Sequence, residues 1–482
     1  MLSLALPFEL RSLLRNRVGI TAVLAYIVIG SVAIAMGARH VSAWEHALDE
    51  AKQAQEASVA EASGYFESGK PGPEDRSWVD LSKPRWQNEY AATRVVRDPG
   101  PLAGIAAGSI DPAPVAFQLR SRADPLAVAG YRIENPEVAS GSVDLVFVLT
   151  MLTPLLIGVL GLEIGGRDRE ERIDRLVIVQ AGEVRGWLVA RVVAVTTIAS
   201  TAVATVCLAA ALVGGAGFSA SATLLGMALG YTILWGGLLL VVAAGAPTVR
   251  VGAFGFGALW TVLCVLLPAT VAEIGVGRTA ADFAIGETLD ARAQQWSAYD
   301  QDAEVRVQAL YARFPELQEL PAGLEEMLAP GLSRHTYKAS QLERLEARHS
   351  ARLQQEADAR QFATRASWLS PPIALTVALE RVAGVGPEAA SAYRSHVVEA
   401  FTDRLHWIVV QAWTLEPLDQ GTFEDLVAEG PAPFRWRPIG LASPAAALLV
   451  WLLAGWLFAM FRLVRTERRF GMGAETSRDR SS

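Results

Sequence analysis

The sequence predicts a mainly α-helical, polytopic membrane protein with six transmembrane helices, a mixed first extracytoplasmic domain and a helical second one. Composition is the first observation: the 482 residues are 51% hydrophobic and only 19% charged, whereas soluble chains carry about 25% charged residues. The apolar residues also gather in six uncharged runs, each near the ~20 residues that a helix needs to cross a bilayer. Finally, arginine clusters alternate with these runs, as expected for helices that cross back and forth.

We predict the six spans at residues 18–37, 145–162, 192–213, 223–244, 252–272 and 444–461. The first run ends in VAIAMGA, which is similar to a signal-peptidase site, so a cleaved signal peptide is an alternative to a retained helix. Signal-peptide cores are usually ~7–15 residues long, and this run is longer and follows an extended basic segment. We therefore favour a retained helix, and under either alternative the chain after it faces outward.

Arginine indicates the orientation. Clusters precede the first span, separate the second from the third and follow the sixth, and Arg250 separates the fourth from the fifth. If the helices alternate, all of these arginines fall on one side, which the positive-inside rule makes cytoplasmic. Both termini are then cytoplasmic, including a tail at 462–482, while the long segments 38–144 and 273–439 lie outside. Both cysteines fall inside spans, so the outer domains are expected to lack disulfides.

The stretch GYFESGKP, residues 64–71, nearly matches a phosphate-binding loop. Gly64, Gly69 and Lys70 have the required spacing, but Pro71 stands where Ser or Thr should hold magnesium. Proline also lacks the N–H that cradles phosphate. The preceding residues have a polar helical pattern rather than that of a buried strand, and the segment is predicted to lie away from cytoplasmic ATP. We interpret the match as chance.

Residues 1–17 place apolar side chains mostly on one face and charged ones opposite. This pattern predicts a helix lying in the cytoplasmic membrane surface, with a simple basic anchor as an equal alternative. The first outer domain, residues 38–144, is predicted to begin with a polar helix at 44–64. It then becomes rich in Pro and Gly and ends in short strands near 115–122 and 128–136.

The second outer domain, residues 273–439, is predicted to be helical. The patterns at 302–314 and 342–365 indicate a helical hairpin. A further helix is expected to begin at Pro371, with Ser370 as its N-cap.

Glycines predict close helix contacts in the membrane. Gly226, Gly230, Gly236 and Gly237 on the fourth span, and Gly252 and Gly255 on the fifth, allow packing within the subunit or at a dimer seam. Ionisable side chains are nearly absent from the spans, whereas ion-coupled carriers usually hold them near the midplane. Work at this membrane is therefore expected to be powered from elsewhere.

The sequence contains no catalytic constellation. HExxH, GxSxG and CxxC motifs are absent, and the six histidines are dispersed through the outer segments. His335 and His349 are the pair that could converge on a metal, but neither has a ligand partner nearby in the sequence. No basic face with interleaved aromatic residues indicates nucleic acid. We expect no enzymatic activity, metal or cofactor in this chain.

The most informative stretch is the predicted cytoplasmic loop 163–191, EIGGRDREERIDRLVIVQAGEVRGWLVAR. Dense charge passes into an apolar turn at 176–179, breaks at QAG and re-enters the membrane at Trp187. The pattern predicts a short amphipathic helix held between two spans and able to move both. A solvated charged loop is the alternative.

This loop, the FELRSLLRNR segment, PLL in the second span and the proline near the end of the fifth together resemble the type-2 ABC exporter permeases. The blocks PLAGIAAGSIDPAP, NPEVASGSVDLVFVLTMLTPLLIG and LSPPIALTVALERVAGVG are similar to the branch described as permease components for multi-copper enzyme maturation. The resemblance covers nearly the whole chain. No metal-ligand spacing supports a metal link.

The resemblance implies a permease subunit of an ABC-2 type transporter in the bacterial inner membrane, acting as an exporter or an envelope mechanotransmitter. ATP and Mg²⁺ would be bound by a separate ATP-binding subunit, and the permease would pair with a second copy or a related permease. The outer domains are larger than a small-molecule pore needs, so a periplasmic or outer-membrane protein is an expected partner besides membrane lipid.

The same resemblance implies that the loop holds a coupling helix that docks on the ATPase. The implied docking residues are Arg167, Arg169, Glu170, Glu171, Arg172, Asp174 and Arg175. The family usually has a GTL-like turn after the acidic pair, where this chain has RID, which implies altered contacts. The alternative is a membrane-anchored periplasmic receptor or scaffold without an ATPase. It predicts a cytoplasmic output module, and the segments predicted inside are short.

Overall fold

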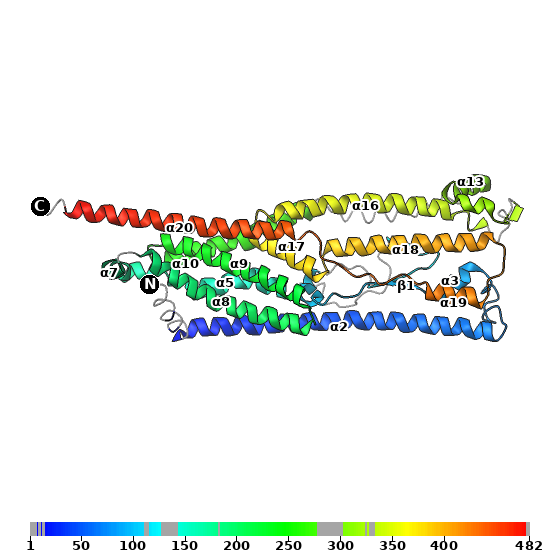
Figure 1. The fold of residues 1–482 in the computed structure, drawn as a ribbon, viewed down its shortest axis with the longest axis horizontal. Helices are drawn as coiled ribbons and strands as arrows, with labels where there is room; N and C mark the ends of the chain where they lie inside the picture. Colours follow the sequence, from blue (N-terminus) through cyan, green and yellow to red (C-terminus); the bar gives the residue numbers. More distant parts are fainter. Residues whose placement is uncertain are drawn as a thin grey trace.

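The chain is mainly helical and elongated, with its helices running along the long axis (Figure 1). The computed structural model describes residues 15–109, 115–126, 143–181, 184–276, 302–322 and 333–478, and positions 7, 11, 325 and 326. Within these residues, six helices are long and apolar enough to cross a membrane, and each predicted span falls inside one of them. The prediction of a multi-pass α-helical membrane protein is therefore confirmed. The six helices occupy Arg17–Glu67, Leu145–Glu170, Arg185–Val213, Phe218–Gly245, Val249–Ile274 and Ala442–Arg465.

Two of these six helices contain a π-helical turn. The second is built from α4 (Leu145–Phe147), the π-helical turn η3 (Val148–Leu152) and α5 (Thr153–Gly161), and continues into α6 (Gly166–Glu170). The fifth is built from α10 (Val249–Trp260), the π-helical turn η4 (Thr261–Leu266) and α11 (Leu267–Val276). The others are α2 (Arg17–Glu67), α8 (Arg185–Val213), α9 (Phe218–Gly245) and α20 (Ala442–Arg478).

Helix α2 is continuous over 51 residues, a length of roughly 75 Å. The first span and the polar helix predicted at 44–64 are therefore parts of one helix, which contains no proline. Asn16 caps its start, because its side-chain oxygen accepts a hydrogen bond from the N–H of Val18 at 3.0 Å. The GYFESGKP stretch lies at its C-terminal end, whereas a phosphate loop precedes a helix. Most of the predicted surface helix 1–17 lies outside the described residues.

Helix α9 lies inside the bundle and packs along α8 and α20. Trp235 is fully buried there. Two adjacent glycines allow both neighbours to approach closely: a Cβ at Gly236 would lie 2.3 Å from Thr196 Oγ1 of α8, and one at Gly237 would lie 2.8 Å from the Trp456 ring of α20. Helix α9 is therefore in close contact with both neighbours.

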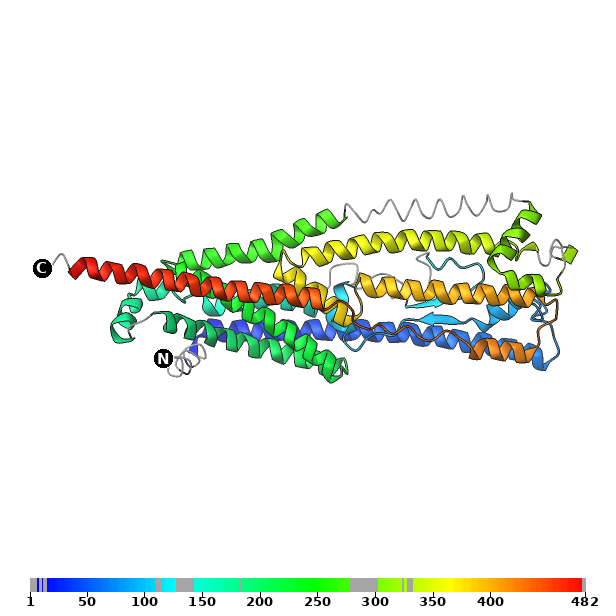
Figure 2. The same cartoon turned by 45° about the horizontal axis from the view of Figure 1, so that its top comes forward.

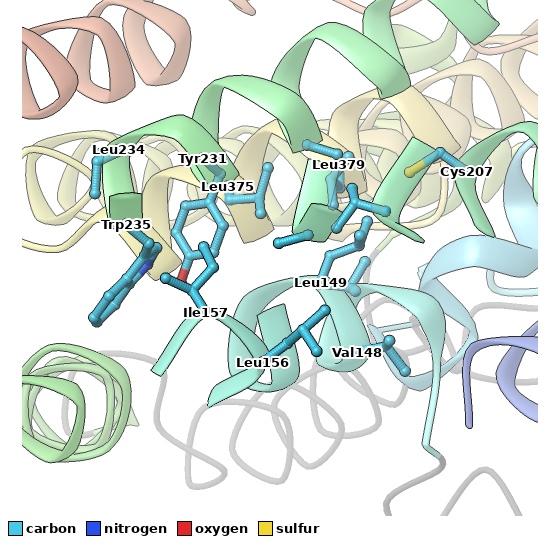
Figure 3. Packing of buried hydrophobic residues seen from close by; sticks show 14 of the residues in the cluster. Val148, Leu149, Leu156, Ile157, Cys207, Tyr231, Leu234, Trp235, Leu375 and Leu379 are labelled. Carbon is cyan, nitrogen blue, oxygen red and sulfur yellow. The ribbon is translucent and has the colours of Figure 1, made fainter. Parts of the chain in front are cut away.

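The short helix α17 (Pro371–Ala383) comes from the second polar segment but packs into the bundle. Its residues Leu375 and Leu379 are fully buried. Figure 3 shows them among side chains of η3, α5 and α9, including Leu149, Ile157 and Tyr231. The predicted start at Pro371 and the N-cap position of Ser370 are confirmed. Thirteen residues are too few to span a bilayer, so the sequence did not indicate this location.

Side chains from neighbouring helices satisfy carbonyl groups of both π-helical turns. A π-helical turn interrupts the regular i to i−4 pattern. The Tyr231 hydroxyl donates to the Thr150 carbonyl of η3 at 2.7 Å, and the Trp260 indole donates to that of Met151 at 3.2 Å. In η4, the buried Ser370 hydroxyl donates to the Leu263 carbonyl at 2.9 Å. Ser370 therefore ties α17 to the fifth span instead of capping its own helix.

A distal body continues the bundle along the axis, built around the second half of α2 (Figure 2). The segment 38–144 adds α3 (Pro84–Ala91), the strand β1 (Arg94–Val96), the 3₁₀ turn η1 (Ala103–Ser109) and the strand β2 (Ala116–Gln118). The segment 273–439 adds α13 (Ala303–Arg313), the 3₁₀ turn η5 (Pro315–Glu319), α16 (Lys338–Ala366), α18 (Pro387–Trp413) and α19 (Gln420–Ala428). The strands pair antiparallel. Helix α13 packs on α16, as the prediction of a helical hairpin requires. The strand predicted at 128–136 lies outside the described residues.

The two polar segments share hydrophobic clusters. One cluster brings Val95 and Phe117 of the first segment together with Phe401 of the second. Another joins Leu81 to Phe423. The division into a mixed first and a helical second domain therefore describes the order of elements along the chain, whereas the packing makes one body of both segments.

Of the six predicted packing glycines, Gly236 and Gly237 lie in the close contacts described above, and the other four lie in different surroundings. A Cβ added at Gly226 or Gly230 of α9 would meet nothing within 4 Å. One added at Gly255 would lie 3.6 Å from Val242 of α9, and one at Gly252 would lie 3.2 Å from the Ala246 side chain. The pair on the fifth span therefore lies against the end of α9 within the subunit, and the pair on the fourth span leaves an open strip on α9.

Candidate functional site

The charged loop forms one end of the molecule, called here the basic end. Helices α6 and α7 (Ile173–Ala181) join the second span to the third, at the end opposite the distal body (Figure 1). Gly165 allows α6 to touch the end of α9: its φ is 79°, a left-handed conformation that glycine adopts freely. A Cβ there would lie 2.3 Å from the Ala243 carbonyl oxygen, and one at Gly166 would lie 2.6 Å from the Thr248 backbone. Helix α6 therefore sits directly on the backbone between α9 and α10.

Arg169 attaches α6 to the C-terminal end of α9. Its guanidinium donates hydrogen bonds to the carbonyls of Ala243 and Ala244, both at 2.8 Å, and also to that of Ala246. The last carbonyls of a helix have no partner within the helix, and a cation there also complements the helix dipole. Arg169 is therefore engaged inside the chain.

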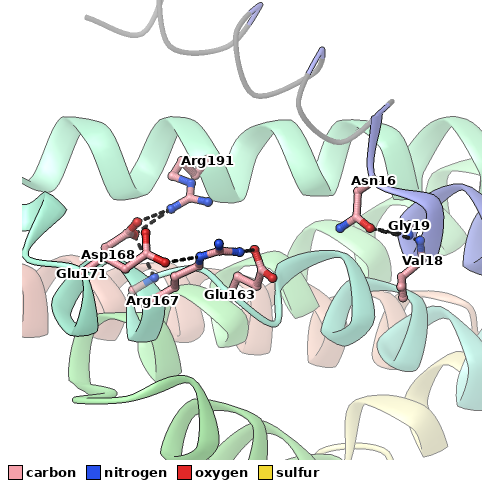
Figure 4. Close-up of polar contacts among 9 residues, drawn as sticks. Asn16, Val18, Gly19, Glu163, Arg167, Asp168, Glu171 and Arg191 are labelled. Carbon is pink, nitrogen blue, oxygen red and sulfur yellow. Dashed lines mark hydrogen bonds and ion pairs between the residues drawn. The ribbon is translucent and has the colours of Figure 1, made fainter.

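Asp168 attaches α6 to α8. Arg191 donates to both of its carboxylate oxygens, at 2.5 and 2.7 Å (Figure 4). The N–H of Gly165 also donates to Asp168 at 3.0 Å, and Asp168 is buried. Removal of one partner from a buried ion pair leaves an uncompensated charge, so this pair holds α6 firmly in place.

Arg167 and its acidic neighbours lie on the outside of α6. Arg167 pairs with Glu163 and Glu171, at 2.8 Å in both cases (Figure 4). All three side chains are about half exposed, so these pairs contribute little to stability. Glu170 is also exposed, and its carboxylate accepts a hydrogen bond from the Val249 N–H at 3.2 Å.

Helix α7 presents an exposed face formed by Arg175, Leu176 and Val179, and the exposed Arg172 directly precedes the helix. The two arginines are exposed, Leu176 is 57% exposed and Val179 is 83% exposed. Val179 lies four residues after Arg175 and three after Leu176, which places these three side chains on one side of the helix. Arg172 lies at the joint between α6 and α7 with a φ of 60°, which is uncommon for a residue other than glycine. An apolar surface bordered by arginines is typical of a protein contact site.

The seven predicted docking residues thus divide into two groups. Arg169 and Asp174 lie inside: Arg169 is hydrogen-bonded to α9, and Asp174 is buried. The exposed group is Arg167, Glu170, Glu171, Arg172 and Arg175.

Sequence reasoning missed three residues that hold the basic end together, namely Asp168, Arg191 and Arg462. The Arg462 guanidinium of α20 donates to the Val241 carbonyl of α9 at 3.2 Å. The charges of the two arginines were visible at the ends of the spans but were used only to orient the helices, and Asp168 was given no role of its own. Their partners lie 23 residues away in the case of Arg191 and 221 in that of Arg462, so no local spacing identified them.

Within the described residues, no group of three or more His, Cys, Asp or Glu side chains could hold a metal ion. Both cysteines, Cys207 and Cys264, are free thiols buried in the bundle.

A family model described as "Domain of unknown function (DUF3526)" matches residues 286–428. The match covers much of the distal body and α17, and it excludes the basic end. No curated protein and no solved structure matches the chain.

Proposed function

We propose that this chain is the transmembrane permease subunit of an ABC-2 type transporter, an exporter or envelope mechanotransmitter driven by a separate ATPase subunit. The observation that carries the proposal is the exposed face of α7, with Arg175 beside Leu176 and Val179 and the exposed Arg172 directly before the helix. This face lies at the end of a bundle of six helices that are apolar enough to cross a membrane. ATP and Mg²⁺ belong to the partner, and this chain has no catalytic step of its own.

Under the positive-inside rule, the arginines support a cytoplasmic location of the basic end in a bacterium. Both termini are then cytoplasmic, the bundle lies in the inner membrane and the distal body is periplasmic. The open strip at Gly226 and Gly230 suits a second copy or a related permease, because small residues let helices approach closely. The distal body is large enough to engage a periplasmic or outer-membrane protein.

The contacts at the basic end support a transmitting role. A force on α7 passes through the Arg172 joint to α6, and from there to α8 through Asp168 and to α9 through Arg169. Helix α9 packs on α8, α20 and α17. Rigid-body displacement of such packed helices is an established way to carry a change between sites. Here the contacts reach α2 through α8, and α2 continues into the distal body.

The test is co-purification of the full chain from its own membranes in mild detergent, with identification of the captured proteins and an assay of ATP hydrolysis. The variant Arg172→Glu with Arg175→Glu reverses two exposed charges without touching a buried contact. The matched control is Lys52→Glu with Lys70→Glu, two exposed lysines, one on the far half of α2 and one in the turn that follows it. We expect an ATPase subunit with the native chain and the control, and its loss with the arginine variant.

Capture of a second, related membrane protein would identify a heteromeric permease pair. If the native chain retains other membrane partners but never an ATPase, the transporter proposal is wrong. A receptor or scaffold function is then the better explanation.

A further inference from the structure

Three segments that are distant in the sequence meet in the distal body, at the end away from the bundle. They are helix α3, the residues after β2 and the turn that leads into α16 (Figures 1 and 2). Lys338, the first residue of α16, joins two of them: its ammonium group donates to the Ser121 carbonyl at 2.7 Å and to Gln341 at 2.9 Å. The Ser121 hydroxyl lies 3.5 Å from a Glu89 carboxylate oxygen of α3.

These segments bring together four cations, here called the distal basic cluster: Arg85, Arg122, Arg334 and Lys338. Lys338 is only 9% exposed, whereas Arg122 and Arg334 are exposed. Among the described residues, none of the four forms an ion pair, since no carboxylate lies within 4 Å of their charged nitrogens. The neighbouring acid Glu89 is 3.7 Å from Arg120 instead.

Two nitrogens beside the cluster are buried without a hydrogen-bond partner among the described residues. They are Nε of Arg85 and Nδ1 of His335, which is 7% exposed. Buried polar atoms in proteins almost always have a partner, and a buried group without one costs free energy. The guanidinium nitrogen of Arg85, unpaired beside the buried ammonium group of Lys338, indicates a missing hydrogen-bond acceptor. A negatively charged acceptor would accept a hydrogen bond from Arg85 and also balance the charge of Lys338.

The charges of the cluster act on one another. Burial, followed by repulsion from Arg122 and Arg85, lowers the pKa of Lys338 to about 8. Burial and repulsion from Lys338, Arg334 and Arg85 lower the pKa of His335 to about 3. The repulsion is unfavourable in the free protein, and an anion placed among these groups would remove it.

We propose that the distal basic cluster is a binding site for an oxyanion of the phosphate or sulfate class. Lys338 and His335 form its buried wall together with the half-buried Arg85, and Arg122 and Arg334 form its rim. Four cations exceed what a single carboxylate neutralises, whereas a divalent tetrahedral anion accepts hydrogen bonds in several directions. The site is independent of the basic end and does not depend on the proposed transporter activity.

The test is titration of the detergent-purified full chain with sodium sulfate at constant ionic strength, followed by calorimetry and by the thermal unfolding temperature. The variant Arg122→Gln with Arg334→Gln removes two exposed charges and leaves the buried wall intact. The matched control is Lys52→Gln with Lys70→Gln. We expect sulfate to stabilise the native chain and the control, and to bind the rim variant roughly tenfold or more weakly.

Equal stabilisation of all three proteins, or equal stabilisation by chloride, would mean that the effect is non-specific and would overturn the site. Inorganic phosphate and glycerol 3-phosphate separate two sources of the same chemistry. Tighter binding of the inorganic ion identifies a free anion as the ligand, and tighter binding of the ester identifies a phosphate group on a larger molecule.

A pH series gives an independent test of the same site. Sulfate keeps its charge between about pH 6 and pH 10, so any change in affinity there comes from the protein. Affinity is expected to fall as the pH rises past about 8, where Lys338 loses its proton. The other charged groups facing Lys338 are Arg85, Arg122 and Glu89, with His335 neutral in this range. An affinity for sulfate that stays constant from about pH 7 to pH 9 would contradict the assignment of Lys338. This measurement uses the native chain, so it does not depend on whether a variant such as Lys338→Met folds.

Discussion

Arg169 and Arg172 are three residues apart in one charged loop but have different surroundings. Arg169 donates to three carbonyls at the end of α9, so Arg169→Met leaves buried acceptors unpaired, at about 1–3 kcal/mol each. Arg172 is exposed, and Arg172→Met should change the free energy of unfolding by less than about 0.5 kcal/mol. Thermal unfolding in detergent compares the two variants. Equal losses of stability would show that the hydrogen bonds of Arg169 do not hold α6 to α9.

Gly37 and Gly104 show how closely α2 and η1 approach. A Cβ at Gly37 would lie 2.0 Å from the Gly104 carbonyl oxygen, and backbone cannot move aside as a side chain can. We expect Gly37→Ala to destabilise the protein by about 1–3 kcal/mol through overpacking. Gly64→Ala in the same helix is the control, because nothing lies within 4 Å of its Cβ and alanine favours the helix by about 0.5–1 kcal/mol. Denaturant unfolding measures both, and a Gly37→Ala protein as stable as the native one would contradict the close contact.

At the scale of the element, α17 links the distal body to the bundle through one buried hydrogen bond as well as through packing. Ser370→Ala removes the donor to the Leu263 carbonyl in η4, so that carbonyl is left without this partner. The cost should be about 1–2 kcal/mol, and hydrogen exchange of the α17 amides should become faster. Ser350→Ala in α16 is the control, since its hydroxyl is exposed and bonds only within its own helix. Unchanged exchange in α17 would mean that apolar packing alone holds it.

At the scale of the whole molecule, the two polar segments should not fold apart from each other. Val95 and Phe117 of the first segment are buried against α18 of the second. Isolation of the first segment exposes these two side chains, and isolation of the second exposes the α18 residues that they cover. We expect residues 38–144 produced alone to lack cooperative thermal unfolding by circular dichroism, and to gain it when mixed with residues 302–439. A cooperative transition for the first segment alone would show that it is an independent domain.

The sequence by itself determined the six membrane helices and the position of the charged loop between the second and third. Both are local properties, because the length of an uncharged run decides whether a helix can cross the bilayer. The start of α17 at Pro371 was local as well, since proline suits a first helical turn. Only the tertiary structure decided that α17 enters the bundle and that the two polar segments share their clusters, because burial depends on which distant surfaces meet.

The same distinction applies to the two sites. The sequence indicated that residues 167–175 were charged and lay between two spans, but not which side chains turned inward. Arg169 is engaged because the last carbonyls of α9, 74 to 77 residues away, lie within its reach. The distal basic cluster was not predicted at all, because Arg85, Arg122 and Lys338 become neighbours only when α3, β2 and α16 pack together. The local sequence pattern predicts the helices and which of them are apolar or charged. Which charged groups face one another depends on the long-range packing of these elements.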